Sequence, residues 1–144
     1  MTSAADPTAE DFANMGIDEV VIRKFVLHFY DVVHDDEILG HYFHNQMSAT
    51  WDEHLDKMCN FWSAILLKTH RFNGRPMPAH TKLTGLQQSD FLHWLKTFEK
   101  SIKHCCTSEA VPHIMKKAHM IANSLQYGVF YKPEIMGSKL NLKN

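Results

Sequence analysis

The sequence predicts an all-α domain, and three observations lead to this fold class. In four long segments the apolar residues recur every three or four positions, which is the spacing of one helix face. No segment shows the alternating pattern and β-branched enrichment of a strand. The 144 residues, 44% of them hydrophobic and 22% charged, are typical of one globular domain with a single core.

The N-terminal part of the chain contains a leader and the first long helix. Residues 1–14 are acidic and lack an apolar core, so we expect a flexible leader rather than a signal peptide. We expect a single domain to follow over residues 15–131. Its first helix spans about 17–34 and carries Phe25 and Phe29 on its apolar face.

A short turn and a second long helix come next. Residues 35–43, DDEILGHYF, indicate a helical turn that is interrupted around Gly40. Thr50 and Glu53 then have the spacing of a capping box, in which each side chain binds the other residue's backbone N–H. The second helix therefore begins here, and its apolar stripe covers residues 55–66.

A break separates the second helix from the third. Residues 71–83, RFNGRPMPAHTKL, contain an Asn-Gly turn signal and two prolines, Pro76 and Pro78, which remove backbone donors and fix φ. His80 follows closely after the second proline. The segment is therefore rigid and presents one histidine.

Two further helices and a tail complete the chain. The third helix starts near Ser89 and the fourth near Ser108. Pro112 fits the first turn of the fourth helix, because a missing N–H is harmless there. Residues 132–144 are polar and include a proline and a glycine, so we expect a flexible tail.

Three residues with hydrogen-bond donors lie on these apolar faces: Tyr30, His54 and Trp94. A buried donor without a partner costs ~1–3 kcal/mol. Each residue alone is ordinarily a core residue whose donor is satisfied locally. Together with His80, they indicate an apolar pocket that holds a few donors and one further histidine. An iron porphyrin requires such a pocket, with apolar walls, one imidazole on the metal and donors opposite.

The sequence resembles the truncated hemoglobins, in particular their third group, over roughly residues 20–130. The resemblance rests on DDEILGHYF, WDEHL, FLHWL and, most distinctively, the run FWSAILLKTHRFNGRPMPAH. None of the six glycines are adjacent, so the glycine pairs of the other truncated groups are absent. The resemblance implies a 2-on-2 helical sandwich around a non-covalent heme b (iron protoporphyrin IX). A Cys-x-x-Cys-His motif for covalent attachment is absent as well.

The resemblance also implies roles for individual residues. His80 corresponds to the proximal iron ligand, and Phe43 to a phenylalanine that packs on the heme. Tyr30, His54 and Trp94 correspond to positions on the distal side, where the ligand binds. Further heme contacts are expected from Met58, Phe61, Phe72, Arg75 and also Trp94.

Two of these positions depart from the family pattern, and one role is open. Met58 stands where an aliphatic residue is usual, and Phe72 stands where the family often has tyrosine. Either Arg71 or Arg75 could pair with a heme propionate, or both could be solvated loop charges.

The implied function is the binding of O2, CO, NO or similar small ligands, in oxygen transport or ligand chemistry. Tyr30 and Trp94 are the donors we expect to contact the ligand, while His54 could join them, gate the entrance or bind the iron itself. A heme enzyme with nitric-oxide dioxygenase or peroxidase-like activity, served by a reductase, is an alternative. A metal-free helical interaction module is a third, and it would leave the inward histidines structural.

Composition excludes several other classes. Fifteen basic and sixteen acidic residues form no basic stripe for nucleic acid. The apolar runs are far shorter than the ~20 residues of a membrane span, so we expect a cytoplasmic protein. The near-neutral charge favours a monomer, and three cysteines give no disulfide framework. His34, His41 and His44 could bind zinc, although a half-exposed surface cluster is the ordinary interpretation.

Overall fold

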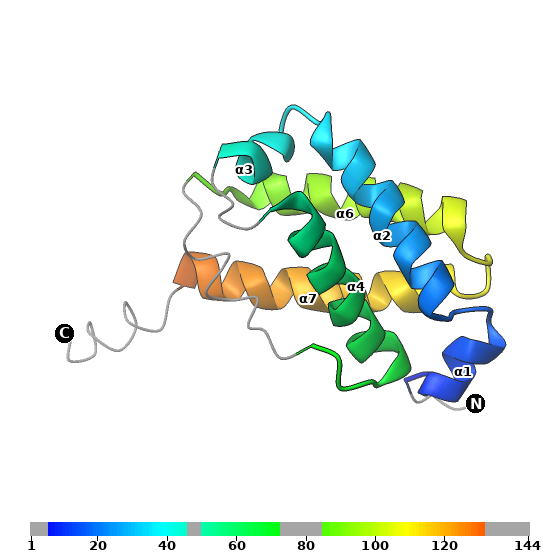
Figure 1. Cartoon of the computed structure of the whole chain (residues 1–144). Helices are drawn as coiled ribbons and strands as arrows, with labels where there is room; N and C mark the ends of the chain where they lie inside the picture. The colour runs from blue at the N-terminus through cyan, green and yellow to red at the C-terminus, as the bar shows by residue number, and fades with distance from the viewer. Residues whose placement is uncertain (1–5, 46–49, 73–84, 132–144) are drawn as a thin grey trace.

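The computed structural model of the protein describes residues 6–45, 50–72 and 85–131. Two short and four long helices occupy these ranges, and no strand occurs within them (Figure 1). No helix in these ranges is long and apolar enough to cross a membrane. The predicted all-α class is confirmed. The helices are α1 (Ala9–Asn14), α2 (Glu19–His34), α3 (Gly40–Asn45), α4 (Trp51–Leu67), α6 (Gln88–Cys105) and α7 (Val111–Tyr131).

The four long helices form two pairs. α2 packs against α4, α6 packs against α7, and the contact between α2 and α6 joins the pairs. In Figure 1, α2 crosses over α6 and α4 crosses over α7. This arrangement agrees with the 2-on-2 sandwich that the resemblance implies.

The core is an aromatic cluster shared by three helices. Phe25 on α2 is fully buried and meets Trp62 of α4 and Phe98 of α6 edge to face, with ring centroids 6.0 and 5.8 Å apart. Trp62 and Phe98 stack on each other at 5.0 Å. Offset and edge-to-face aromatic pairs add ~0.5–1.5 kcal/mol beyond their area burial, so this cluster fixes how α2, α4 and α6 pack.

The capping box that begins α4 is present as predicted. The Thr50 hydroxyl accepts a hydrogen bond from the Glu53 N–H at 3.2 Å, and the Glu53 carboxylate accepts one from the Thr50 N–H at 3.0 Å. These bonds satisfy backbone donors that a helix start otherwise leaves without partners. The first turn of α4 is therefore well defined.

The expected flexible leader is wrong for residues 9–14, which form α1. Thr8 and Asp11 make a second capping box at the start of this helix. Phe12 is fully buried in the core, and α1 packs against α4. Gly16 then turns the chain toward α2 with a φ of 87°, a conformation that glycine adopts without strain.

The corner between α2 and α3 also differs from its prediction. Gly40 is the first residue of α3 rather than an interruption. The Asp36 carboxylate closes the preceding turn by accepting the N–H groups of Ile38 at 2.9 Å and Leu39 at 2.8 Å. Its second oxygen binds His93 of α6 at 2.7 Å. Burial opposes ionisation of Asp36, but these hydrogen bonds hold its pKa below the usual value.

A second polar contact ties α3 to the start of α6. The buried Tyr42 hydroxyl contacts the Asp90 carboxylate at 2.8 Å and the Gly85 carbonyl at 3.1 Å. Burial and the neighbouring Asp90 raise the pKa of Tyr42 to about 12. The tyrosine therefore stays protonated, and its hydroxyl donates a hydrogen bond to Asp90 at the start of α6.

Candidate functional site

Tyr30 and His54 meet between α2 and α4. Their ring centroids are 4.8 Å apart and the rings are nearly perpendicular, at 89°. Tyr30 is buried near the end of α2, and His54 is half-buried in the first turn of α4. Two residues far apart in the sequence are thus adjacent because α2 packs against α4.

Burial determines the protonation state of Tyr30. Removal from water, and secondarily the nearby Cys59, raise the pKa of this phenol well above its ordinary value. A tyrosine with a raised pKa stays neutral, because the low-dielectric surroundings disfavour the phenolate. Tyr30 therefore keeps a proton to donate throughout the physiological pH range.

Trp51 is a site residue that sequence reasoning did not single out. Its ring meets Tyr30 edge to face at 5.9 Å and lies nearly parallel to His54 at 6.1 Å. The available signal was its place directly after the capping threonine, one helical turn before His54 on the same side of α4. Trp51 packs against both donor residues and limits how they can move.

Trp94 of α6 joins the same aromatic cluster through Phe29. Its ring meets Phe29 edge to face at 6.1 Å and stacks on Phe98 at 5.4 Å. Phe29 in turn meets Tyr30 at 4.8 Å. The structure therefore connects the three predicted distal donors, which come from three different helices, within one cluster.

The other predicted contacts are partly described. Met58 and Phe61 are half-buried on α4 and pack against the core. Phe72 meets Phe61 edge to face at 5.1 Å. Phe43 lies on α3, and the structure describes it only as part of that helix. His80 and Arg75 lie outside the described residues.

Arg71, one of the two candidate propionate partners, has a partner in the protein. Its Nε lies 3.4 Å from a Glu19 carboxylate oxygen, which also accepts the Ser63 hydroxyl at 2.7 Å. These contacts tie the segment after α4 to the start of α2. The Arg71 side chain is 57% exposed, so this contact is a surface ion pair.

No metal cluster of the kind considered for zinc occurs in the part of the chain that the structure describes. His34 lies 3.2 Å from the Asp35 carboxylate, and the ring of His41 lies 4.0 Å from that of Tyr42. The side chain of His44 is outside the described set. The zinc alternative therefore stays a sequence hypothesis.

Comparison with known proteins gives two matches, whereas no family model matches the chain. The group 3 truncated hemoglobin ctb of Campylobacter jejuni is 35% identical over 119 residues, which are 81% of this chain and 93% of that protein. The crystal structure of a group III truncated hemoglobin from Campylobacter jejuni superposes with a TM-score of 0.74 at 34% identity. It covers 79% of this chain and 92% of the other. The similarity thus extends over a whole domain.

Proposed function

The chain belongs to the group 3 truncated hemoglobins, and from this membership we propose that it binds O2, CO or NO at a heme beside Tyr30 and His54. The observation that supports this most is the contact of these two rings, 4.8 Å apart, with Tyr30 buried and His54 half-buried. Membership in a family of heme proteins explains why two side chains with hydrogen-bond donors meet on helix faces that are otherwise apolar.

The chemistry of the described residues fits a heme b. Apolar side chains from α4, including Met58 and Phe61, suit the faces of a macrocycle. Tyr30 and Trp94 add donors that a bound ligand can use. When bound, the heme would supply a ferrous iron with one coordination position open to a diatomic ligand.

The remaining heme contacts follow from the correspondence with the family. We propose His80 as the protein ligand of the iron, because a neutral imidazole is the usual proximal ligand in globins. Phe43, Phe72 and Arg75 complete the proposed contacts, with Arg75 near a propionate. Arg71 is the weaker choice for that role because Glu19 already pairs with it.

Tyr30 is the donor that we expect to hold the ligand. When bound, the heme would present the ligand to this side of the pocket, and a preorganised donor such as the Tyr30 hydroxyl would stabilise negative charge there without reorganisation. Tyr30 suits this role because its raised pKa keeps the hydroxyl protonated. Packing against Phe29 and Trp51 holds the ring in place.

An absorption spectrum tests the proposal. The purified protein is measured oxidised, then reduced with dithionite, then exposed to carbon monoxide. We expect a strong Soret band that shifts on addition of carbon monoxide. If no Soret band develops even after hemin is added, the proposal is wrong and the metal-free interaction module becomes the better interpretation.

A second candidate function is a heme enzyme with nitric-oxide dioxygenase or peroxidase-like activity. Three side chains with hydrogen-bond donors lie in one cluster, which supports this candidate. Several hydrogen bonds to an oxygen ligand would hold it too tightly for delivery and would instead polarise its O–O bond. Turnover would require a reductase as electron donor. Stopped-flow kinetics separates the two functions: slow oxygen release with fast nitric oxide oxidation indicates the enzyme, and fast reversible binding indicates a carrier.

A further inference from the structure

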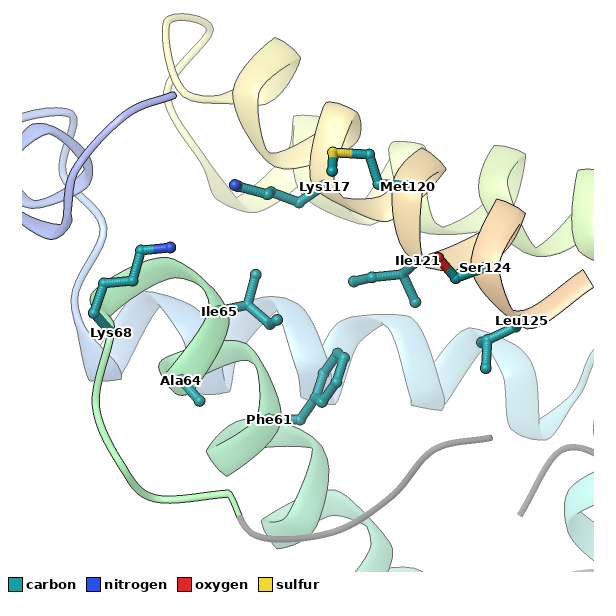
Figure 2. Close-up of a pocket in the computed structure, with 9 residues that line it drawn as sticks. All are labelled: Phe61, Ala64, Ile65, Lys68, Lys117, Met120, Ile121, Ser124 and Leu125. Atoms are coloured by element: carbon teal, nitrogen blue, oxygen red, sulfur yellow. The ribbon is translucent and has the colours of Figure 1, made fainter. Parts of the chain in front are cut away.

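A groove of about 460 Å³ between α4 and α7 belongs to the proposed heme site (Figure 2). Phe61 lines it from α4 and Leu125 from α7, and Phe61 is one of the proposed heme contacts. A separate group of polar side chains lies toward the C-terminal end of α6. There His104 follows Trp94 by ten residues, which is about 15 Å along the helix axis. This group is therefore distinct from the distal cluster.

Two histidine rings stack across the contact between α2 and α6. The rings of His28 and His104 have centroids 4.5 Å apart and planes inclined by only 25°. The Nδ1 atom of His28 lies 2.8 Å from the Ser101 hydroxyl oxygen, one turn before His104 on α6. His28 is half-buried, His104 is exposed and Ser101 is fully buried. The histidine pair thus lies at the surface, with a buried hydroxyl behind it.

The core next to this pair fixes its position. Phe25 precedes His28 by three residues and Phe98 precedes Ser101 by three, so each lies on the same side of its helix as the polar residue. The two phenylalanine rings meet edge to face at 5.8 Å and set the separation of α2 and α6 here. The imidazoles are therefore held together by packing that requires no ligand, which lowers the entropic cost of binding one.

The contact with Ser101 bears on which nitrogen of His28 can bind a ligand. When the Ser101 oxygen accepts the Nδ1 proton, the lone pair of the neutral imidazole is on Nε2. Histidines that bind metals usually donate their other ring N–H to an oxygen acceptor, which fixes the orientation of the ring. Ser101 is placed to have this role toward His28.

We propose that His28 and His104 bind a Zn²⁺ ion through their imidazole nitrogens. Tetrahedral coordination with Zn–N bonds of about 2.0–2.1 Å places two nitrogen ligands roughly 3.3 Å apart, which rings stacked at 4.5 Å reach by small side-chain rotations. No cluster of three or more His, Cys, Asp or Glu that could hold a metal occurs in the described ranges of the chain. The protein therefore supplies two ligands, and water completes the coordination shell.

The chemistry of the pair favours Zn²⁺ over the common hard cations. Imidazole nitrogens suit Zn²⁺, whereas Mg²⁺ and Ca²⁺ prefer oxygen ligands. The ammonium of Lys103, next to His104 in the sequence, is paired with the Glu99 carboxylate at 3.4 Å, so its repulsion of a cation is partly compensated. A bound ion would link α2 to α6 at the surface.

Calorimetric titration of the purified full-length chain with zinc chloride tests the proposal. We expect one saturable site per chain, and no comparable heat with magnesium chloride. His28→Gln and His104→Gln should each abolish this site, because glutamine offers no imidazole nitrogen. Ser101→Ala keeps both ligands and should raise the Kd roughly tenfold through loss of the supporting hydroxyl. His119→Gln, which removes an exposed histidine of α7, is the matched control and should leave the Kd unchanged.

Thermal unfolding gives a second readout. An ion that links two helices binds the folded chain more tightly than the unfolded one, so excess Zn²⁺ should raise the Tm of the native protein but not that of His104→Gln. The absence of saturable binding would overturn the proposal, as would a native Kd in either ligand variant. An equal loss of affinity in His119→Gln would show nonspecific binding to surface histidines and would overturn it as well. Because zinc binding is measured without the Soret band, failure here is distinct from failure to bind heme.

Discussion

Tyr30 and His54 contact each other edge to face, 4.8 Å apart, although they belong to different helices. The crossing of α2 and α4 creates this contact, and the aromatic cluster around Phe25 fixes the crossing. The distal chemistry of the proposed function therefore depends on helix packing as well as on the two residues themselves. Mutations that loosen the packing of α2 on α4 should change ligand binding even where they touch no ligand.

Replacing Tyr30 with phenylalanine should raise the oxygen dissociation rate roughly ten- to hundredfold, because a hydrogen bond to a charged group contributes ~1.5–3 kcal/mol. Stopped-flow displacement of oxygen by carbon monoxide measures the rate. Tyr127→Phe, at an exposed tyrosine of α7, is the matched control and should release oxygen at the native rate. A Tyr30→Phe protein with native kinetics would remove Tyr30 from the mechanism.

Replacing His80 with alanine should abolish the native axial coordination of the iron, because the proposed imidazole ligand is lost. Absorption and resonance Raman spectra of the ferrous protein measure this coordination. Added imidazole should restore it in part. His70→Ala, which removes an exposed histidine shortly after α4, serves as the control. Unchanged axial ligation in His80→Ala would show that another residue binds the iron.

Local signals were sufficient to predict most of the fold. The helical spacing of apolar residues predicted the four long helices, and Thr50 with Glu53 marked the start of α4 correctly. α1 was missed because a helix of 6 residues with one buried side chain, Phe12, is too short to show periodicity. Its capping box, Thr8 with Asp11, was the signal that could have revealed it.

The family was predicted from motifs, and the sequence match and the structure match from Campylobacter jejuni confirm it. Spacing within one helix placed Tyr30 and His54 on inward faces, but spacing cannot show which residues of different helices meet. For the same reason Trp51 was overlooked, and the groove between α4 and α7 could not be foreseen. Both depend on the angle at which helices cross. The roles of His80 and Arg75 stay predictions.

Replacing Thr50 with alanine should lower the free energy of unfolding by ~1 kcal/mol, because the capping hydroxyl that holds the first turn of α4 is lost. Urea unfolding followed by circular dichroism measures the change. Thr50→Ser keeps the hydroxyl and should restore most of the stability. Trp51 and His54 belong to this turn. The alanine variant should therefore also bind ligands with more than one rate. Equal stability of the alanine and serine variants would contradict a capping role.

Asp36 should contribute stability that is lost in acid. Its pKa in the folded protein is below the usual value, so the contribution is present above about pH 4, near the unfolded pKa, and is lost as the pH falls through the folded pKa. Asp36→Asn should destabilise the protein at pH 7 by ~1–3 kcal/mol through its hydrogen bonds to Leu39 and His93. The variant should also lose less stability between about pH 4 and pH 2 than the native protein.

The control for Asp36 is its neighbour Asp35, whose side chain is 89% exposed. Asp35→Asn should leave both the stability at pH 7 and its decline in acid close to the native values, because exposed ion pairs contribute little. Urea unfolding over a series of pH values measures both variants. Parallel acid profiles for the Asp36→Asn and native proteins would show that Asp36 does not carry the pH dependence.

Tyr42 should contribute stability that is lost in alkali. Burial and Asp90 raise its pKa to about 12, above the value of ~10 expected for the unfolded chain. The contribution is therefore fully present below about pH 10 and is lost as the pH rises through the folded pKa. Tyr42→Phe removes the donor to Asp90 and should reduce stability at neutral pH while flattening the decline above pH 10. Tyr127→Phe should keep the native alkaline profile, and an unchanged profile in Tyr42→Phe would place the alkaline dependence at another group, with Tyr30 as the first candidate.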